Sequence, residues 1–127
     1  MDQKNILLVE DEPLLGNLLR QRLEKEGYTV TWNRDGEEAM NTLRSKKPDL
    51  ILLDVILPKI SGFKLMETIR SDPQMERAPI FVISNLGQDT DVAKGQSLGA
   101  SQYFIKAKLS IEDLVGQVNT FFAGGKK

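Results

Sequence analysis

Four consecutive apolar residues, Leu50 to Leu53, lie between Pro48 and Pro58, and Asp54 follows them directly. The run is too short for a helix and too uniformly apolar for a strand with one face in water. It is typical of a central strand of a parallel sheet, which is buried on both faces. Ligands of open α/β sheets bind beyond the carboxyl ends of the strands. We therefore expect the chemistry of this chain to centre on Asp54.

The segments around this strand alternate between strand and helix patterns. Short apolar, β-branched or aromatic runs predict strands over residues 5–9, 28–32, 79–84 and 102–105. Apolar residues at helical spacing predict helices over 13–26, 37–46, 63–71, 89–98 and 111–122. This alternation predicts an α/β fold, a five-stranded parallel sheet that is doubly wound, with five helices on its two faces.

The apolar positions of each helix predict its buried face, and polar residues before two of the helices, Asp35 and Ser110, predict N-caps. The side chains expected to face the core are Leu14, Leu15, Leu18, Leu19 and Leu23 in the first helix, Ala39, Met40 and Leu43 in the second, Phe63, Leu65, Met66 and Ile69 in the third, Val92, Ala93 and Leu98 in the fourth, and Leu114, Val115, Val118, Phe121 and Phe122 in the last.

Composition narrows the possible functions. The 127 residues, 40% of them hydrophobic, suit one domain over 1–127, with a core over about 4–122 and a flexible tail over 123–127. The chain has no cysteine and no histidine, which excludes disulfides, thiolate sites and imidazole chemistry. The net charge of −1 gives no electrostatic footprint for direct nucleic acid binding. No signal peptide and no apolar stretch of ~20 residues is present, so we expect a cytoplasmic protein without membrane insertion.

Polar residues follow four of the predicted strands. They are Glu10 with Asp11, then Asp54, Ser84 and Lys106. If the first and third strands are neighbours, three carboxylates crowd together and repel one another unless a cation intervenes. Oxygen ligands of this kind suit Mg²⁺. With the Lys106 ammonium and the Ser84 hydroxyl, they would form a pocket for a phosphoryl group, and Asp54 would be its nucleophile.

The chain resembles the receiver domain of bacterial two-component response regulators, especially the single-domain, chemotaxis-regulator-like members, over residues 4 to about 122. The matching motifs are ILLVEDE, LILLDVILPKISG, PIFVIS and GASQYFIK, which lie at the ends of successive strands. The resemblance implies the flavodoxin-like strand order 2-1-3-4-5, for which a member of this family is itself a standard example.

The resemblance also implies roles for individual residues. Asp54 matches the phosphoacceptor, Asp11 the direct Mg²⁺ ligand, and Glu10 an acidic position that helps through water. Ile56 would offer its backbone carbonyl to the metal. The remaining matches are Ser84 to the switch hydroxyl, Lys106 to the phosphoryl-binding lysine, Tyr103 to the aromatic that changes rotamer on activation, and Pro58 and Gly62 to the loop after the phosphoacceptor.

Two positions depart from the family pattern. Ala107 replaces the usual proline after the lysine, so we predict a trans Lys106–Ala107 peptide, because a cis bond before a non-proline residue costs roughly 2.5–4 kcal/mol. Asn85 replaces the usual Ala or Gly. Together with Ile56 and Leu86 it is expected to tune the rate of dephosphorylation and to give a long-lived phosphorylated form.

The resemblance implies a phosphorelay signalling module rather than an enzyme acting on other substrates. Its expected partners are a sensor histidine kinase or phosphotransfer protein and a downstream output protein, which would read the face of the fourth helix, fifth strand and fifth helix. It implies a monomer or a phosphorylation-dependent dimer, and a receiver that either stands alone or belongs to a longer protein. The alternatives are an aspartyl-phosphate phosphatase, a phosphorylation-independent adaptor and a flavin or nucleotide binder. The absence of a D-x-D first strand, the full acidic set and the absence of a glycine-rich phosphate loop argue against them in turn.

Overall fold

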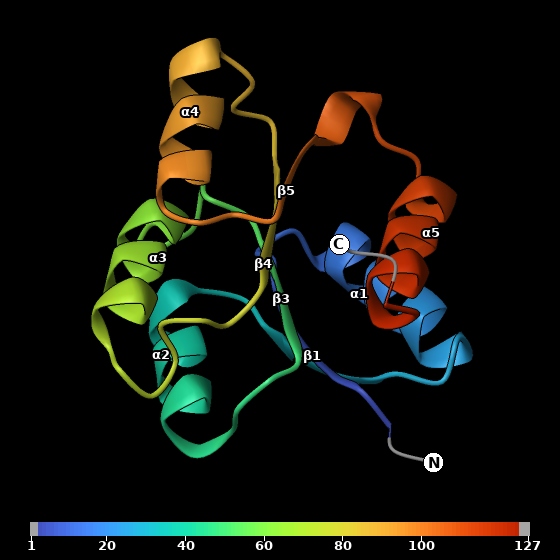
Figure 1. Ribbon diagram of the computed structural model, residues 1–127. Coiled ribbons are helices and arrows are strands. Elements are labelled where there is room, and N and C mark those ends of the chain that lie inside the picture. Colours follow the sequence, from blue (N-terminus) through green and yellow to red (C-terminus); the bar gives the residue numbers. More distant parts are fainter. Residues whose placement is uncertain (1–2, 125–127) are drawn as a thin grey trace.

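Figure 1 shows the fold of the computed structural model, which describes residues 3–124. Five parallel strands form one sheet in the order β2-β1-β3-β4-β5, which confirms the predicted fold class and strand order. The strands are β1 (Asn5–Val9), β2 (Thr29–Asn33), β3 (Leu50–Leu53), β4 (Ile80–Ser84) and β5 (Gln102–Ile105). The helices are α1 (Pro13–Lys25), α2 (Gly36–Ser45), α3 (Gly62–Ser71), α4 (Asp89–Ser97) and α5 (Ile111–Phe122), with a short 3₁₀ turn, η1 (Lys106–Lys108), before the last.

The predicted tail falls partly on residues 125–127, which lie outside the described residues, and only Ala123 and Gly124 of it are placed. Between residues 3 and 124, no helix is both long enough and apolar enough to cross a bilayer. The predicted caps are confirmed, since the side chains of Asp35 and Ser110 accept hydrogen bonds from the first turns of α2 and α5.

The helices cover the sheet in two layers, with α1 and α5 on one face and α2, α3 and α4 on the other (Figure 1). The central strand β3 has no exposed side chain, as its uniform apolarity predicts. Its alternate residues serve the two layers. Leu50 and Leu52 pack with residues of α1 and α5, whereas Ile51 and Leu53 pack with residues of α2 and α3. The sheet therefore separates two apolar cores, and the predicted site residues lie at its carboxyl edge.

The predicted buried face of α1 is partly wrong. Leu19 and Leu23 are buried, but Leu14 is 79% exposed and Leu18 42%. The five leucines spread over an arc of about 180° at ~100° per residue, so they cannot all face one sheet. Gly16 decides which side faces inward, because the Trp32 ring packs so closely on it that a Cβ there would lie 2.2 Å from a ring carbon. The helix turns Gly16 toward the sheet, which leaves Leu14 and Leu18 in solvent.

The predicted face of α4 is also partly wrong. Ala93 is exposed, and the buried residue of this helix is Gly95. The Tyr103 ring occupies the space beside Gly95, where a Cβ would come within 2.8 Å of it. An aromatic side chain from β5 thus fills a gap that a larger residue in α4 would close.

One side chain ties the end of α4 to the rest of the molecule. Arg70 of α3 donates to the carbonyls of Leu98 at 2.8 Å and Gly99 at 3.0 Å. It also donates to the carbonyls of Glu76 at 2.7 Å and Ala78 at 2.8 Å, in the segment before β4. We call this group of contacts the Arg70 anchor. It fixes the C-terminal end of α4 against α3, and no carboxylate among residues 3–124 pairs with the guanidinium.

Candidate functional site

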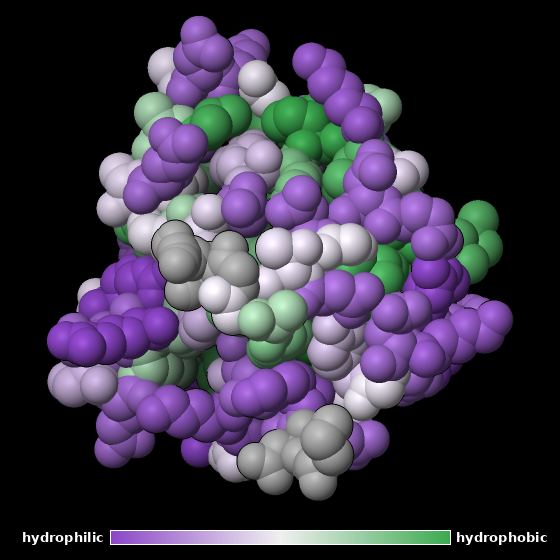
Figure 2. Space-filling view, turned by 45° about the vertical axis from the view of Figure 1, so that its right-hand side comes forward, coloured by the Kyte–Doolittle hydropathy of each residue, from purple (hydrophilic) through white to green (hydrophobic). Residues whose placement is uncertain are grey.

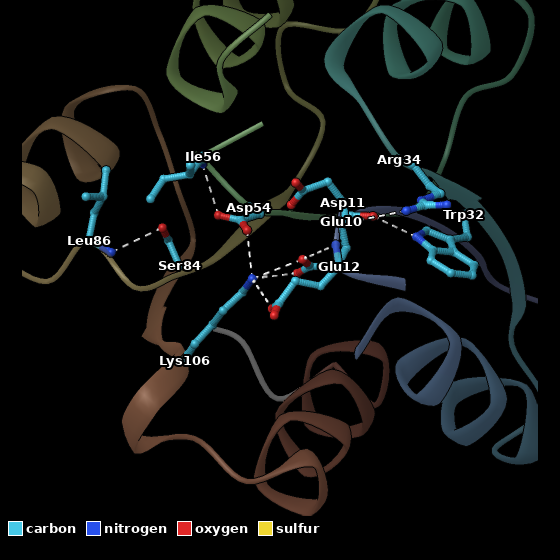
Figure 3. A network of polar contacts seen from close by, with 10 residues as sticks. All are labelled: Glu10, Asp11, Glu12, Trp32, Arg34, Asp54, Ile56, Ser84, Leu86 and Lys106. Carbon is cyan, nitrogen blue, oxygen red and sulfur yellow. Dashed lines mark hydrogen bonds and ion pairs between the residues drawn. The ribbon is translucent and has the colours of Figure 1, made fainter. Parts of the chain in front are cut away.

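The polar residues that follow the strands meet at the carboxyl edge of the sheet (Figure 3). Glu10 follows β1, Asp54 follows the neighbouring β3, Ser84 ends β4 and Lys106 follows β5. Glu10 is 1% exposed, Asp54 4% and Ser84 0%. Buried carboxylates need a partner of opposite charge. The negative charge of the Glu10 and Asp54 carboxylates must therefore be neutralised by a group within the site.

Lys106 supplies that neutralisation in this structure. Its Nζ lies 2.7 Å from Asp54 Oδ2 and 2.9 Å from Glu10 Oε1. A third carboxylate, Glu12 Oε1, lies 3.2 Å away. Glu12 is a site residue that sequence reasoning missed, although its position two residues after Glu10 is a usable signal. The cation that the crowded carboxylates require is here an ammonium group.

The two charged partners shift each other in opposite directions. Burial raises the pKa of Glu10, and this outweighs the hydrogen bonds from Lys106 and from the Glu12 amide, which lower it. Burial by itself would lower the pKa of Lys106, but the hydrogen bonds and charges of Asp54 and Glu10 together raise it. Lys106 is therefore held in its charged form.

Three carboxylates could hold a metal ion. Glu10, Asp11 and Asp54 each offer an oxygen, and these oxygens lie within 4.8 Å of one another. Asp11 is only half-buried, so its side chain is open to water. An all-oxygen set with an accessible side fits a hard divalent cation that keeps some of its waters. The metal role predicted for the Ile56 carbonyl stays a prediction. The Ile56 amide donates to Asp54 Oδ1 at 3.0 Å.

The predicted switch residues are joined through Leu86. The Ser84 hydroxyl oxygen accepts from the Leu86 amide at 3.2 Å, and the Tyr103 hydroxyl donates to the Leu86 carbonyl at 2.6 Å. The structure thus brings Ser84 and Tyr103 into one chain of contacts with the loop between β4 and α4. Asn85, within this loop, is exposed.

The loop after Asp54 is held in a tight conformation. The Ile60 amide donates to the Pro58 carbonyl at 2.8 Å across Lys59, whose φ is +71°, and these features indicate a γ-turn. Gly62 lies so close to the start of the loop that a Cβ there would approach the Asp54 carbonyl to 2.4 Å. Pro58 and Gly62 therefore shape the backbone that presents Asp54.

The bond after the predicted phosphoryl-binding lysine is trans, as expected. Residues 3–124 contain no cis peptide. Lys106 and Ala107 form part of η1, and Lys106 reaches the carboxylates from the start of this turn. Alanine is thus accommodated here with ordinary backbone geometry.

Sequence reasoning missed the end of β2. Trp32 and Arg34 donate to the backbone carbonyls of Glu10 and Asp11 (Figure 3). Nothing in the sequence pattern marks these two residues, because the contacts depend on the pairing of β2 with β1 and on the ring being seated against Gly16.

Comparisons with known proteins agree with this geometry. Residues 6–119 match the family model of the response regulator receiver domain. The phosphate regulon transcriptional regulatory protein PhoB of Rhizobium meliloti (strain 1021) is 36% identical over 121 residues, which are 95% of this chain and 53% of PhoB. The chain thus spans about half the length of this relative.

Two solved structures are also similar. The phosphorylated cyanobacterial phytochrome response regulator RcpA has a TM-score of 0.87 and 30% identity, covering 99% of this chain and 98% of RcpA. The Mn²⁺-bound response regulator Rcp1 has a TM-score of 0.83 and 29% identity, covering 94% of each chain. One of these relatives was captured with a phosphoryl group and the other with a divalent metal.

Proposed function

This chain belongs to the response regulator receiver domain family, and we propose that it is the phosphoacceptor module of a two-component phosphorelay, with Asp54 as the acceptor. One observation carries the proposal. The buried Asp54 carboxylate lies beside the Lys106 ammonium, at 2.7 Å, and within a cluster of three carboxylates suited to a divalent cation. A nucleophile, a fixed positive charge and a metal site are the parts that phosphoryl transfer to a carboxylate needs.

In the proposed reaction, an Asp54 oxygen forms a bond to phosphorus as the bond from phosphorus to the donor's histidine nitrogen breaks. Lys106 Nζ would donate to a phosphoryl oxygen, and the Ser84 hydroxyl would donate to another. Mg²⁺ bound by Glu10, Asp11 and Asp54 would neutralise charge on the phosphoryl oxygens. The buried edge of the sheet would strengthen these interactions by limiting access of water.

The proposed output is a change in the loop between β4 and α4. Ser84 and Tyr103 both contact the backbone of Leu86. If the Ser84 hydroxyl turns to a phosphoryl group, its contact with the Leu86 amide is lost and the loop must rearrange. An output protein would then read the face of α4, β5 and α5. We propose that the chain catalyses no reaction on other substrates. We also propose that it works in the cytoplasm, where sensor histidine kinases transfer their phosphoryl groups.

We further propose that a kinase or phosphotransfer partner contacts the exposed apolar residues on α1 and next to Asp54. Leu14 and Leu18 lie one helical turn apart, and Ile56 follows Asp54 by two residues and is 53% exposed. On the face in Figure 2, hydrophobic residues reach the surface at a few places among mainly hydrophilic residues. Exposed leucines of this kind favour binding to a partner's apolar surface.

Replacing both Leu14 and Leu18 by glutamate should therefore slow phosphorylation by a purified histidine kinase domain about five-fold or more, the equivalent of ~1 kcal/mol of lost contact. Phosphorylation by acetyl phosphate, which needs no protein docking, should be unchanged. The measurement is the initial rate with each donor. Equal slowing with both donors would assign the leucines to folding rather than to docking.

The direct test of the proposed function uses acetyl phosphate and intact mass spectrometry. We expect wild type to gain the mass of one phosphoryl group in Mg²⁺ and to gain none in chelator. Asp54→Asn, which keeps the shape but removes the nucleophile, should gain none in either condition. Label that persists in Asp54→Asn, or that forms equally in chelator, would refute the assigned acceptor or the metal requirement.

A further inference from the structure

Three hydrogen bonds join the backbone of Glu10 and Asp11 to the end of β2 and to Arg34, the residue directly after it. The Glu10 amide donates to the Asn33 carbonyl at 3.0 Å. The Glu10 carbonyl accepts from Trp32 Nε1 at 2.9 Å, and the Asp11 carbonyl accepts from the Arg34 guanidinium at 3.1 Å (Figure 3). Trp32, Asn33 and Arg34 thus each form one hydrogen bond with the backbone of Glu10 or Asp11. These two residues carry two of the three carboxylates of the candidate metal site.

These donors are themselves fixed. The Trp32 ring is seated against Gly16, which has no Cβ to exclude it. The Arg34 guanidinium carbon lies 6.0 Å from the centre of the Trp32 ring. The Arg34 amide also donates to Glu38 Oε1 at 2.8 Å, so the residue is tied to the first turn of α2. Packing against Gly16 therefore holds the Trp32 ring, and the exposed Arg34 side chain extends from a backbone that is tied to α2.

The same turn touches the loop on the other side of the site. The Gly36 amide lies 3.4 Å from the Pro58 carbonyl, and a Cβ on Gly36 would approach the Ile60 carbonyl to 2.3 Å. Lys59 Nζ lies 3.3 Å from Glu37 Oε1. Residues 32–37 therefore contact both the segment that carries Glu10 and Asp11 and the loop that follows Asp54.

We propose that Trp32 and Arg34 are positioning residues of the divalent cation site, acting through the backbone carbonyls of Glu10 and Asp11. This inference rests on the proposed function, because it assigns residues to the same site. Groups that orient metal ligands change metal affinity by about 10–100-fold when they are removed. Arg34 also carries a positive charge close to the site, and by Coulomb repulsion alone that charge weakens the binding of a cation.

The two roles of Arg34 predict effects of opposite sign, which makes the test sharp. In Arg34→Gln, loss of repulsion alone would tighten binding, whereas loss of positioning should weaken it by about ten-fold. Trp32→Phe keeps a ring against Gly16 but removes the indole donor, and it should weaken binding by about five-fold or more. Arg34→Lys keeps a charged donor and should recover most of the lost affinity. Arg44→Gln, a matched control whose guanidinium donates to Asn41 away from the site, should bind like wild type.

The probe is Mn²⁺. Electron paramagnetic resonance measures the concentration of free Mn²⁺ during titration of each variant. Trp32 is the only tryptophan, so its single indole N–H resonance reports the contact with Glu10 directly and should shift when Mg²⁺ binds. Thermal melting in chelator provides the folding control. A merely structural role would lower the melting temperature and leave the Mn²⁺ affinity of the folded protein unchanged.

The outcomes separate the two levels of the proposal. Weaker Mn²⁺ binding in Arg34→Gln and Trp32→Phe, with recovery in Arg34→Lys, supports the inference. Unchanged or tighter binding in Arg34→Gln overturns it while leaving the phosphoacceptor function intact. Failure of wild type itself to bind Mn²⁺ overturns the metal site and the positioning role together.

Discussion

Replacing Lys106 by methionine will lower the free energy of unfolding by about 3 kcal/mol in chelator. This corresponds to an increase of more than about 100-fold in the equilibrium constant for unfolding. The methionine keeps most of the apolar stem but leaves Glu10 and Asp54 without their ammonium partner. Side-chain exposure is 11% for Lys106, 2% for Glu10 and 5% for Asp54, so water cannot replace the lost contacts. Removing one partner of a buried ion pair is costly because it strands the other.

The loss should depend on pH and on metal. Burial already raises the pKa of Glu10 above its ordinary 4.5, and removing Lys106 removes a group that lowers it. An acid whose pKa is raised by folding contributes stability below its unfolded pKa and loses it as pH rises through the folded value. The deficit of Lys106→Met should therefore be largest near neutral pH and shrink toward pH 4.5. Mg²⁺ should also reduce it, because the ion supplies the missing positive charge.

Urea unfolding of Lys106→Met and Lys108→Met measures this effect. Lys108 lies in the same turn, is exposed and forms no ion pair within residues 3–124, so its loss should change stability by less than about 0.5 kcal/mol. Equal stability of the two variants at neutral pH in chelator would show that the carboxylates are neutralised by other means.

The double variant Ile56→Asn and Leu86→Glu should lose its phosphoryl group at least about ten-fold faster than wild type, or roughly 1.4 kcal/mol of barrier. Hydrolysis needs a water in line with the bond from Asp54 to phosphorus. Figure 3 shows both residues on the Ser84 side of Asp54. The Ile56 amide and the Leu86 amide and carbonyl make their hydrogen bonds through the backbone, so the two side chains can be exchanged without breaking them. Neither wild-type side chain can orient a water, whereas asparagine and glutamate can.

The decay of phospho-Asp54 after rapid removal of the donor measures this rate. Leu14→Glu is a matched control, because it makes the same chemical change at an exposed leucine on α1 and should leave the decay unchanged. A wild-type lifetime of seconds, or equal decay in the double variant, would show that Asn85 or another group controls access of water.

The sequence predicts the fold well because the strands are short, apolar and separated by helices of clear period. Five short runs of this kind leave few arrangements, and four of them are followed by polar residues that the parallel sheet brings to one edge. The pairing of Glu10 with Asp54 follows from β1 and β3 being neighbours. The resemblance to receiver domains supplied the strand order, which periodicity does not contain.

The features that sequence reasoning missed depend on packing between distant segments. Five leucines predict that α1 is amphipathic, but the packing of the Trp32 ring against Gly16 determines which face of the helix turns toward the sheet. The reach of Lys106 to Glu12 depends on how η1 enters the site. In the same way, Gly95 is the buried residue of α4 because Tyr103 of β5 lies beside it. Periodicity describes one element at a time and contains none of these contacts.

The Arg70 anchor restricts how α4 can move. Its guanidinium, which is charged at every physiological pH, donates to two carbonyls at the C-terminal end of α4 and to two carbonyls in the segment before β4. The other end follows the loop that carries Leu86 and is closed by the reciprocal contacts of Gln88 and Asp91. Arg70 belongs to α3, so the contacts at Leu98 and Gly99 join the C-terminal end of α4 directly to that helix. We therefore expect a displacement of the loop to move the N-terminal half of α4 more than its C-terminal end.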